Sequence, residues 1–262
     1  MKIAVIGVGV VGRHMVKDLE QTTVEVVPYD IRFNADFLFA TREEVNRCDA
    51  AFVCVGTPEL DNGEADLSAI KDVFSWLTVP VPIIRSTFPP NSLTLPSNAV
   101  FSPELIGEGV NAPYNHMRQP PFIVIGGTPV ARQNAADVYA HIYNAECEII
   151  FMDFVTAQMV KYAVNTFLAT KVTWANEFYN ICGVVGADFH QMMNAVTHDY
   201  RIGRSHTQVF PDNRGFGGRC FPKDTAALLA AVGGETAGLL AAVRRINALQ
   251  QKKNRPLFSK EK

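Results

Sequence analysis

The segment GFGGRCFPKD, residues 215–224, places Cys220 behind a run of glycines and Asp224 four residues beyond the cysteine. Glycine is used where the backbone takes a positive φ or must approach another group closely. Gly215, Gly217 and Gly218 therefore predict a loop wrapped around a ligand. Cys220 in that loop is a candidate nucleophile, although most free cysteines are small buried hydrophobic residues.

A second pair of polar residues lies in a long helical pattern that begins near residue 156. Lys161 and Asn165 are four residues apart, so they share one face of the helix, and their neighbours are apolar. Together they could stabilise a developing oxyanion, more strongly if the lysine is buried. A solvated helical lysine is the alternative, and the pattern alone leaves both open.

Two carboxylates, Glu104 and Glu108, lie four residues apart in SPELIGEG. Such a pair can orient water or accept protons. On a protein surface, carboxylates more often contribute only solubility, so the pair gains meaning only from its surroundings.

The N-terminal segment has the order of a dinucleotide-binding motif, which would position a cofactor. An apolar strand at 2–6 leads into GVGVVG at 7–12 and then into a helical pattern through residue 20. We expect Gly7 to make the tight turn, Gly9 to admit a pyrophosphate, and Gly12 to let the helix pack on its strand. The cofactor-binding residues expected here are Gly7, Gly9, Val10, Val11 and Gly12.

The second strand indicates which cofactor binds. Residues 24–29 form an apolar strand that ends at Asp30, about twenty residues after the glycines, where a carboxylate can bind both ribose hydroxyls. The same carboxylate repels a 2′-phosphate, so Asp30 favours NAD. Arg32, two residues on, keeps NADP as an alternative.

Four further apolar strands are predicted at 51–55, 81–85, 100–102 and 122–125. They lead into VGTP, STFPP, SPE and GGTP, and because ligands of open α/β sheets lie beyond the carboxyl ends of strands, we expect all four loops to line the cofactor crevice. The cofactor-binding residues expected in these loops are Val55, Gly56, Thr57 and Thr87.

The pattern changes after residue 153, where long helical runs replace the alternation of strands and helices. The predicted fold is therefore α/β, with a Rossmann-type NAD-binding domain at 1–153 followed by an all-helical central domain at 154–254 and a tail at 255–262. The helical domain would carry the catalytic loop.

Composition limits the class of protein. With 24 Lys and Arg against 26 Asp and Glu, and 48% hydrophobic residues, the sequence is typical of a soluble globular protein and gives no sign of nucleic-acid or membrane binding. The five cysteines have neither paired nor metal-type spacing, which predicts reduced thiols in the cytoplasm and no metal site. Glycines interrupt the apolar N-terminus, so we do not expect a signal peptide.

The chain resembles the UDP-glucose/GDP-mannose dehydrogenase family, which oxidises a nucleotide-sugar alcohol twice to a carboxylate with two NAD+. The resemblance runs over nearly the whole chain and is carried by VIGVGVVG (5–12), VGTP (55–58), RSTFPP (85–90), SPELIGEG (102–109), KYAVNTFLATKVTWANE (161–177), DYRIG (199–203) and GFGGRCFPKD (215–224).

The resemblance implies roles for the catalytic residues. Cys220 would trap an aldehyde as a thiohemiacetal that is oxidised to a thioester, which water then hydrolyses. Lys161 and Asn165 would stabilise the oxyanions, and Asp224 would act with Lys161 in proton transfer and water activation. Thr87 and Glu108 would hold the hydrolytic water.

The resemblance also implies substrate contacts. Glu104 and Leu105 would lie near the nucleotide sugar, with Lys161 and Asn165 beside it, and Arg201 would reach the substrate of a neighbouring subunit. Backbone N–H groups of Gly215, Gly217 and Gly218 would wrap the sugar.

Several features depart from the family. The stretch between Asp30 and Val53 is short, Gln158 replaces a usual glutamate, and arginines at 214 and 219 replace small residues. Relatives continue into a third, nucleotide-binding α/β domain that this sequence lacks. We therefore expect a substrate held without it, or a partner chain that supplies it.

The segment 235–250 bears on assembly. It places apolar residues at helical spacing, which predicts a stripe that a homodimer through the central helices would cover. The residues of that stripe are Leu239, Leu240, Val243, Ile246 and Leu249.

Two other functions stay open. A β-hydroxyacid or 6-phosphogluconate-type dehydrogenase shares the nucleotide domain and a helical lysine, but needs no thiolate. A truncated, non-catalytic NAD-binding homologue is the second alternative.

Overall fold

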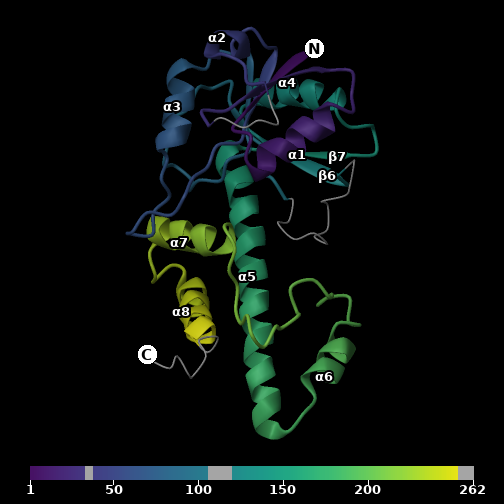
Figure 1. The fold of residues 1–262 in the computed structure, drawn as a ribbon, viewed down its shortest axis with the longest axis vertical. Helices are drawn as coiled ribbons and strands as arrows, with labels where there is room; N and C mark the ends of the chain where they lie inside the picture. The colour runs from purple at the N-terminus through teal and green to yellow at the C-terminus, as the bar shows by residue number, and fades with distance from the viewer. Residues whose placement is uncertain (33–37, 106–119, 253–262) are drawn as a thin grey trace. The chain divides into compact units, whose positions relative to one another are not determined.

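The computed structural model describes residues 1–32, 38–105 and 120–252. The chain divides into two compact units, Met1–Asp61 with Ala65–Lys161, and Asn62–Glu64 with Tyr162–Lys262. The first is an α/β unit and the second is helical (Figure 1). The predicted fold class is confirmed.

The described residues of the first unit form a seven-stranded sheet in the order β2-β1-β3-β4-β5-β6-β7. β2 is an edge strand, which explains how it accommodates Pro28. The strands are β1 (Lys2–Ile6), β2 (Glu25–Tyr29), β3 (Ala50–Val53), β4 (Val81–Ile84), β5 (Val100–Phe101), β6 (Phe122–Gly126) and β7 (Glu148–Met152).

The prediction for one loop is wrong. β6 runs antiparallel to β5, with Phe101 opposite Gly126, whereas β1 to β5 are mutually parallel. The GGTP turn after β6 therefore lies at the edge where β5 begins, and a side chain on Gly127 would meet Ala99 O. An antiparallel neighbour needs no crossover helix, and apolar residues do not encode strand direction.

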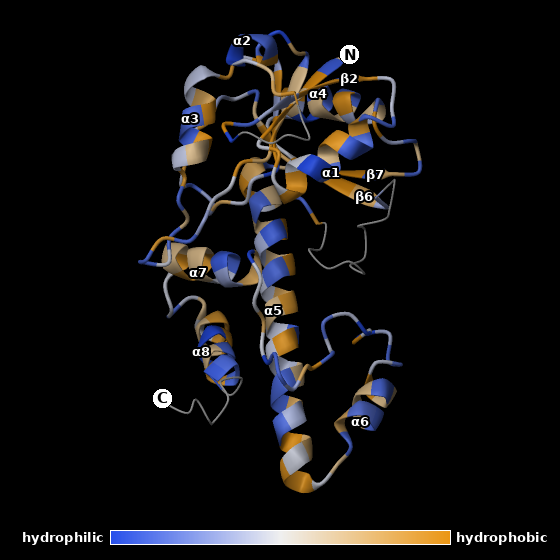
Figure 2. Cartoon of the chain, viewed as in Figure 1, coloured by the Kyte–Doolittle hydropathy of each residue, from blue (hydrophilic) through white to orange (hydrophobic). Residues whose placement is uncertain are grey.

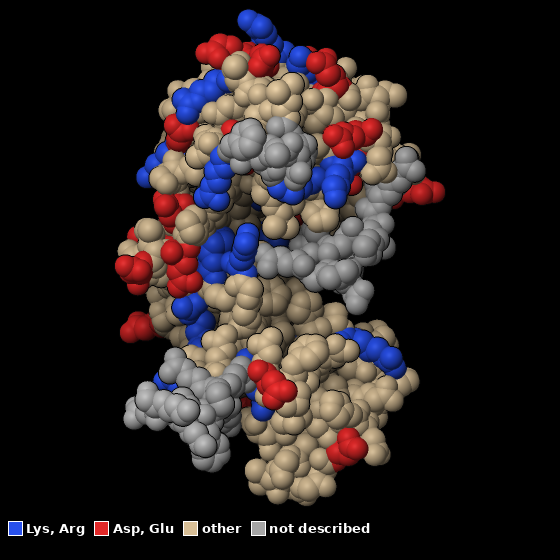
Figure 3. All heavy atoms as spheres, in the orientation of Figure 1, with Lys and Arg blue, Asp and Glu red and all other residues tan. Residues whose placement is uncertain are grey.

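Both faces of the sheet are buried, so its strands are continuous apolar runs. Ile3 and Val5 of β1 pack with α1 (Val10–Leu19) and α4 (Pro129–Ala140), while Ala4 and Ile6 pack with α2 (Arg42–Val45) and α3 (Ser68–Trp76). Figure 2 shows the strands as hydrophobic ribbons between these helices. On the face drawn in Figure 3, charged residues of both signs intermingle.

Helix α5 (Phe154–Val185) begins in the first unit and continues into the second. The second unit also contains α6 (Phe189–Val196), α7 (Phe221–Val232) and α8 (Gly238–Lys252). Across the part of the chain that the structure describes, no helix combines the length and apolar character that a membrane span requires.

The predicted apolar stripe of α8 is partly buried within the chain and partly exposed. Leu240 and Val243 are buried, but Leu239 is 71% exposed and Leu249 is 50% exposed. The buried face continues instead through the polar residues Asn247 and Gln250, because their amides hydrogen-bond to backbone groups.

Candidate active site

The glycine loop after β1 is shaped by close backbone contacts. Gly7 N donates to Tyr29 O at the end of β2 (2.8 Å), and a Cβ on Gly12 would lie 2.0 Å from Gly7 O. No side chain fits at Gly12, so α1 packs directly on the loop. At Gly9, by contrast, a Cβ would have nothing within 4 Å, so the backbone there is open on that side.

Asp30 lies where β2 ends, beside the glycine loop. Its Oδ2 accepts from Val8 N (2.7 Å) and its Oδ1 accepts from Arg32 N (2.9 Å). A cavity of about 320 Å³ lies next to it, lined by Gly7, Tyr29 and Val55 among others. The glycine cradle, the carboxylate and the cavity together fit the ribose and adenine side of a dinucleotide.

The loops after β3 and β4 are tied to each other. Thr57 Oγ1 donates to Thr87 O (2.6 Å), and Ser86 Oγ donates to Val55 O (2.7 Å). Thr57 and Ser86 are buried, so these hydrogen bonds fix the two loops that were expected to line the cofactor crevice. Gly56 lies between Val55 and Thr57 in the same loop.

Gln158, one of the departures from the family pattern, has a structural partner. Its side chain is 1% exposed, and Nε2 donates to Phe88 O (3.1 Å) in the loop after β4. A carboxylate has no hydrogen to donate at this position unless it is protonated. The amide therefore suits the contact that this chain makes.

A buried ionic cluster follows β4 and β5. The Arg85 guanidinium is paired with the Glu104 carboxylate, and the side chains of both are less than a tenth exposed. Arg85 Nη1 also donates to Tyr139 Oη (2.9 Å), which donates to Ser102 Oγ (2.7 Å). Burial alone would lower the pKa of Arg85, but Glu104, Tyr139 and Tyr143 together outweigh burial and hold that pKa well above its ordinary value.

Lys161 belongs to the same cluster in the first unit. It is buried, and its Nζ donates to the backbone oxygen of Glu104. The solvated alternative for this lysine is therefore wrong. Two cations therefore contact Glu104: Arg85 pairs with its carboxylate, and Lys161 donates to its backbone carbonyl. These contacts fix the segment that also contains Leu105.

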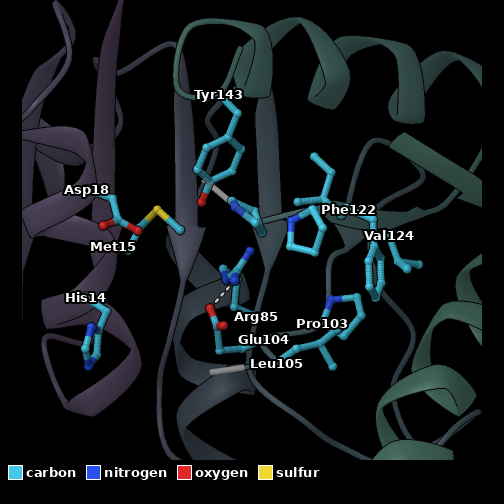
Figure 4. Close-up of a pocket in the computed structure, with 13 residues that line it drawn as sticks. His14, Met15, Asp18, Arg85, Pro103, Glu104, Leu105, Phe122, Val124 and Tyr143 are labelled. Atoms are coloured by element: carbon cyan, nitrogen blue, oxygen red, sulfur yellow. Dashed lines mark hydrogen bonds and ion pairs between the residues drawn. The ribbon is translucent and has the colours of Figure 1, made fainter. Parts of the chain in front are cut away.

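A cavity of about 60 Å³ lies against this cluster, large enough for about two waters. Figure 4 shows His14 and Asp18 facing it from α1, with the Arg85–Glu104 pair on the other side. Burial, with a smaller contribution from Glu104, raises the pKa of Asp18 to about 6. Ionising Asp18 in the folded protein therefore costs free energy.

The second unit contains the cysteine loop. Cys220 is half-buried and immediately precedes α7, and Asp224 N donates to Cys220 O (2.8 Å) in the first turn. Asp224 is 1% exposed; its Oδ2 accepts from Asn165 Nδ2 and its Oδ1 is paired with Lys223 Nζ. A carboxylate, an amide and a thiol-bearing turn are thus held together within one unit.

Tyr162 adds a buried hydroxyl near Asp224. Its side chain is 0% exposed, and its Oη has no hydrogen-bond partner among the described residues. Burial, helped by the charge of Asp224, raises the pKa of this hydroxyl, so it stays protonated and can donate.

The remaining predicted residues are placed as follows. Gly215 N donates to Asn176 Oδ1 (3.2 Å), and Gly217 and Gly218 follow in the loop. Arg201 is exposed and paired with Asp199 (2.5 Å). Glu108 lies outside the described residues.

Sequence reasoning missed several residues that hold these groups. Arg85 lies in the RSTFPP motif, which predicted no role for it, and the sequence patterns made no prediction for Tyr139, Lys223 or Tyr162. Only Arg85 could have been identified from the sequence, because a charged residue that directly follows a fully buried apolar strand is unusual. Within 1–32, 38–105 and 120–252, no group of three or more His, Cys, Asp or Glu could hold a metal ion.

Comparison with known proteins shows that the chain is similar to nucleotide-sugar dehydrogenases. The model of the UDP-glucose/GDP-mannose dehydrogenase family, central domain, matches residues 155–249. A putative UDP-glucose 6-dehydrogenase of Bacillus subtilis is 30% identical over 296 residues, covering 95% of this chain and 68% of the relative. The solved UDP-glucose dehydrogenase of Pyrobaculum islandicum has a TM-score of 0.79 at 27% identity, over 95% of this chain and 68% of the other.

Many of the curated relatives are longer. A UDP-glucose 6-dehydrogenase of Rickettsia bellii is 36% identical over 205 residues, which are 71% of this chain and 45% of the relative. The chain thus spans about half the length of several curated relatives that it matches.

Proposed function

Since this chain belongs to the UDP-glucose/GDP-mannose dehydrogenase family, we propose that it oxidises the C6 alcohol of a nucleotide sugar such as UDP-glucose to a carboxylate. The observation that carries the proposal is the second unit's arrangement of Cys220 and Asp224, four residues apart, with Asn165 on the Asp224 carboxylate. The enzyme is an NAD-dependent oxidoreductase that uses a cysteine nucleophile.

NAD fits the first unit. Gly9 leaves room for a pyrophosphate at the start of α1, and Gly7 and Gly12 allow the close backbone packing of the loop beside it. Val10 and Val11 would contribute backbone N–H groups. Asp30 would bind the ribose hydroxyls. In doing so, its carboxylate would release the backbone N–H groups of Val8 and Arg32 and accept hydrogen bonds from the hydroxyls instead. The further residues that would contact NAD are Arg32, Val55, Gly56, Thr57 and Thr87.

The first oxidation removes a hydride from C6 and a proton from its hydroxyl, leaving an aldehyde. When bound, NAD+ would supply the hydride acceptor for this oxidation and for the second one. The Cys220 thiolate then adds to the aldehyde carbon, and the resulting oxyanion is stabilised by Lys161 and Asn165. Loss of the second hydride from that carbon leaves a thioester on Cys220.

Hydrolysis completes the cycle. Water adds to the thioester carbon and the tetrahedral intermediate expels the Cys220 thiolate, releasing the acid. Asp224, with Lys161, takes part in the proton transfers, and Thr87 and Glu108 hold the water. Glu104, Leu105, Gly217 and Gly218 would contact the substrate, whereas the N–H of Gly215 is already donated to Asn176 Oδ1.

The proposed function also implies a domain organisation. Residues 1–153 form the NAD-binding domain, 154–254 the central domain, and 255–262 a tail, in a cytoplasmic enzyme.

A homodimer through the central helices is part of the proposal. Phe167, Val184 and Leu239 are 65%, 86% and 71% exposed, so apolar surface remains on α5 and α8 (Figure 2). Each Arg201 would then reach the partner's substrate. Light scattering at micromolar concentration should give the mass of a dimer; a monomer mass would contradict this.

The test of the function is direct. The protein is mixed with NAD+ and a panel of UDP- and GDP-sugars, and the absorbance of reduced cofactor is followed. We expect turnover with at least one UDP-sugar. Oxidation of a simple β-hydroxyacid or 6-phosphogluconate instead would favour the other dehydrogenase class, and no turnover at all would favour a binding protein.

A further inference from the structure

Helix α8 contacts the cysteine loop on both sides of Cys220. On the N-terminal side, Phe216 N donates to Asn247 Oδ1 (2.7 Å) and Asn247 Nδ2 donates back to Phe216 O (3.0 Å). Gln251 Nε2 donates to the same oxygen (2.7 Å). One side-chain amide thus holds the N–H and C=O of a single residue, which fixes the loop in both position and orientation.

On the C-terminal side, Arg244 Nη1 donates to Pro222 O (2.8 Å) and to Thr225 Oγ1 (3.0 Å). Arg244, Asn247 and Gln251 are spaced three and four residues apart, so they lie on one face of α8. Cys220 lies between the two anchored residues, Phe216 and Pro222.

The loop is shaped to accept this contact. Gly215 has a φ of 79°, and a Cβ there would lie 2.4 Å from Asn247 Oδ1, so neither the backbone conformation nor the space allows a side chain. Helix α5 holds the start of the loop, because Asn176 Oδ1 accepts from Gly215 N (3.2 Å) and from Arg214 Nε (2.6 Å). Asn176 and Asn247 are 2% and 6% exposed, which removes competition from water.

We propose that Asn247 and Arg244 are positioning residues for the nucleophile: they fix the two ends of the segment 216–222 on α8, so that Cys220 is presented in one conformation. The proposal rests on the role of Cys220 in the proposed function. A displacement of a catalytic group by about 1 Å can lower the rate about 100-fold. A loosened loop should therefore cause a large loss of kcat with only a small loss of folding stability.

Gln250 offers a matched control. It lies on the same helix, is 3% exposed, and its Nε2 donates to Thr173 O of α5 (3.0 Å) rather than to the loop. Asn247→Leu and Gln250→Leu each remove a buried amide from α8, but only the first releases Phe216. Arg244→Met removes the second anchor while keeping the aliphatic stem.

The experiment compares these three variants with the parent. Hydrogen exchange of the Phe216 amide should accelerate by at least about tenfold in Asn247→Leu and remain at the parent rate in Gln250→Leu. With the nucleotide sugar that the parent oxidises, Asn247→Leu and Arg244→Met should lose about 100-fold in kcat. Their NAD+ affinities should stay within about twofold of the parent, whereas Gln250→Leu should keep the parent kcat.

Parent kcat in Asn247→Leu, or an equal loss in Gln250→Leu, would overturn the positioning role. If the parent itself oxidises no nucleotide sugar, the proposed function fails, and the positioning role is then judged by alkylation of Cys220 with iodoacetamide. The rate, followed by mass spectrometry of the peptide that contains Cys220, should change severalfold in Asn247→Leu but not in Gln250→Leu. Equal rates in all three proteins would overturn it.

Discussion

Asp18 gives a prediction whose sign and size follow from the structure. It lies on α1 beside the Arg85–Glu104 pair, where burial, and then Glu104, raises its pKa from 3.8 to about 6. A carboxyl whose folded pKa is raised costs stability wherever the unfolded chain has it ionised. That cost is absent below the unfolded pKa, grows as the pH rises from about 4 to about 6, and is constant above.

The two pKa values differ by about two pH units, which at roughly 1.4 kcal/mol each gives about 3 kcal/mol as the largest effect. Asp18→Asn removes the charge and keeps the shape. Because Asp18 is only partly buried, solvent screening reduces this value. The variant should therefore be more stable than the parent by about 1 to 2 kcal/mol near pH 7.5, and nearly equal to it near pH 4. Urea unfolding followed by circular dichroism at both pH values measures the difference.

Glu20→Gln is the matched control, because Glu20 is exposed just after the same helix. It should change stability by less than about 0.5 kcal/mol at either pH. An Asp18→Asn variant that is less stable than the parent near pH 7.5, or equally stabilised at both pH values, would refute the argument.

Two more predictions concern the cofactor site. Gly9→Ala should fold with the parent's Tm, because a Cβ at Gly9 meets no protein atom, but it should lose NAD+ affinity in calorimetry if the pyrophosphate binds there as proposed. Gly12→Ala should lower stability by about 3 kcal/mol or more, since its Cβ would lie 2.0 Å from Gly7 O. Equal Tm values for the two variants would contradict this. Asp30→Ala should weaken NAD+ binding about 10- to 100-fold and reduce the preference of the protein for NAD+ over NADP+. An unchanged ratio of the two affinities would count against the ribose contact.

The sequence predicted the parts of the fold that depend on local pattern. Apolar runs located all the strands from β1 to β6, and the glycine spacing located the turn into α1. The direction of β6 could not be predicted in the same way, because both faces of the sheet are buried and a reversed strand buries the same residues. The GGTP loop was placed at the wrong edge for that reason.

Candidate site residues were predictable where they share a short motif. Cys220 and Asp224 are four residues apart, as are Lys161 and Asn165, so helical spacing brings each pair together. The residues that hold them are distant in the chain: Arg85 reaches Tyr139 across 54 residues and Phe216 reaches Asn247 across 31. In α8 the periodicity identified Leu240 and Val243, but buried amides carry no hydrophobic signal, and Asn247 was missed.

The central claim is that Cys220 carries the second oxidation, and the number of hydrides released per sugar tests it most directly. The parent and Cys220→Ser are each incubated with excess NAD+ and a limiting amount of the nucleotide sugar that the parent oxidises, and reduced cofactor and sugar products are quantified together. The parent should release two reduced cofactors per sugar and form the carboxylate. Cys220→Ser should bind NAD+ as the parent does and stop at the aldehyde or at a serine-linked adduct. A Cys220→Ser variant that forms the carboxylate at the parent's rate would contradict the account.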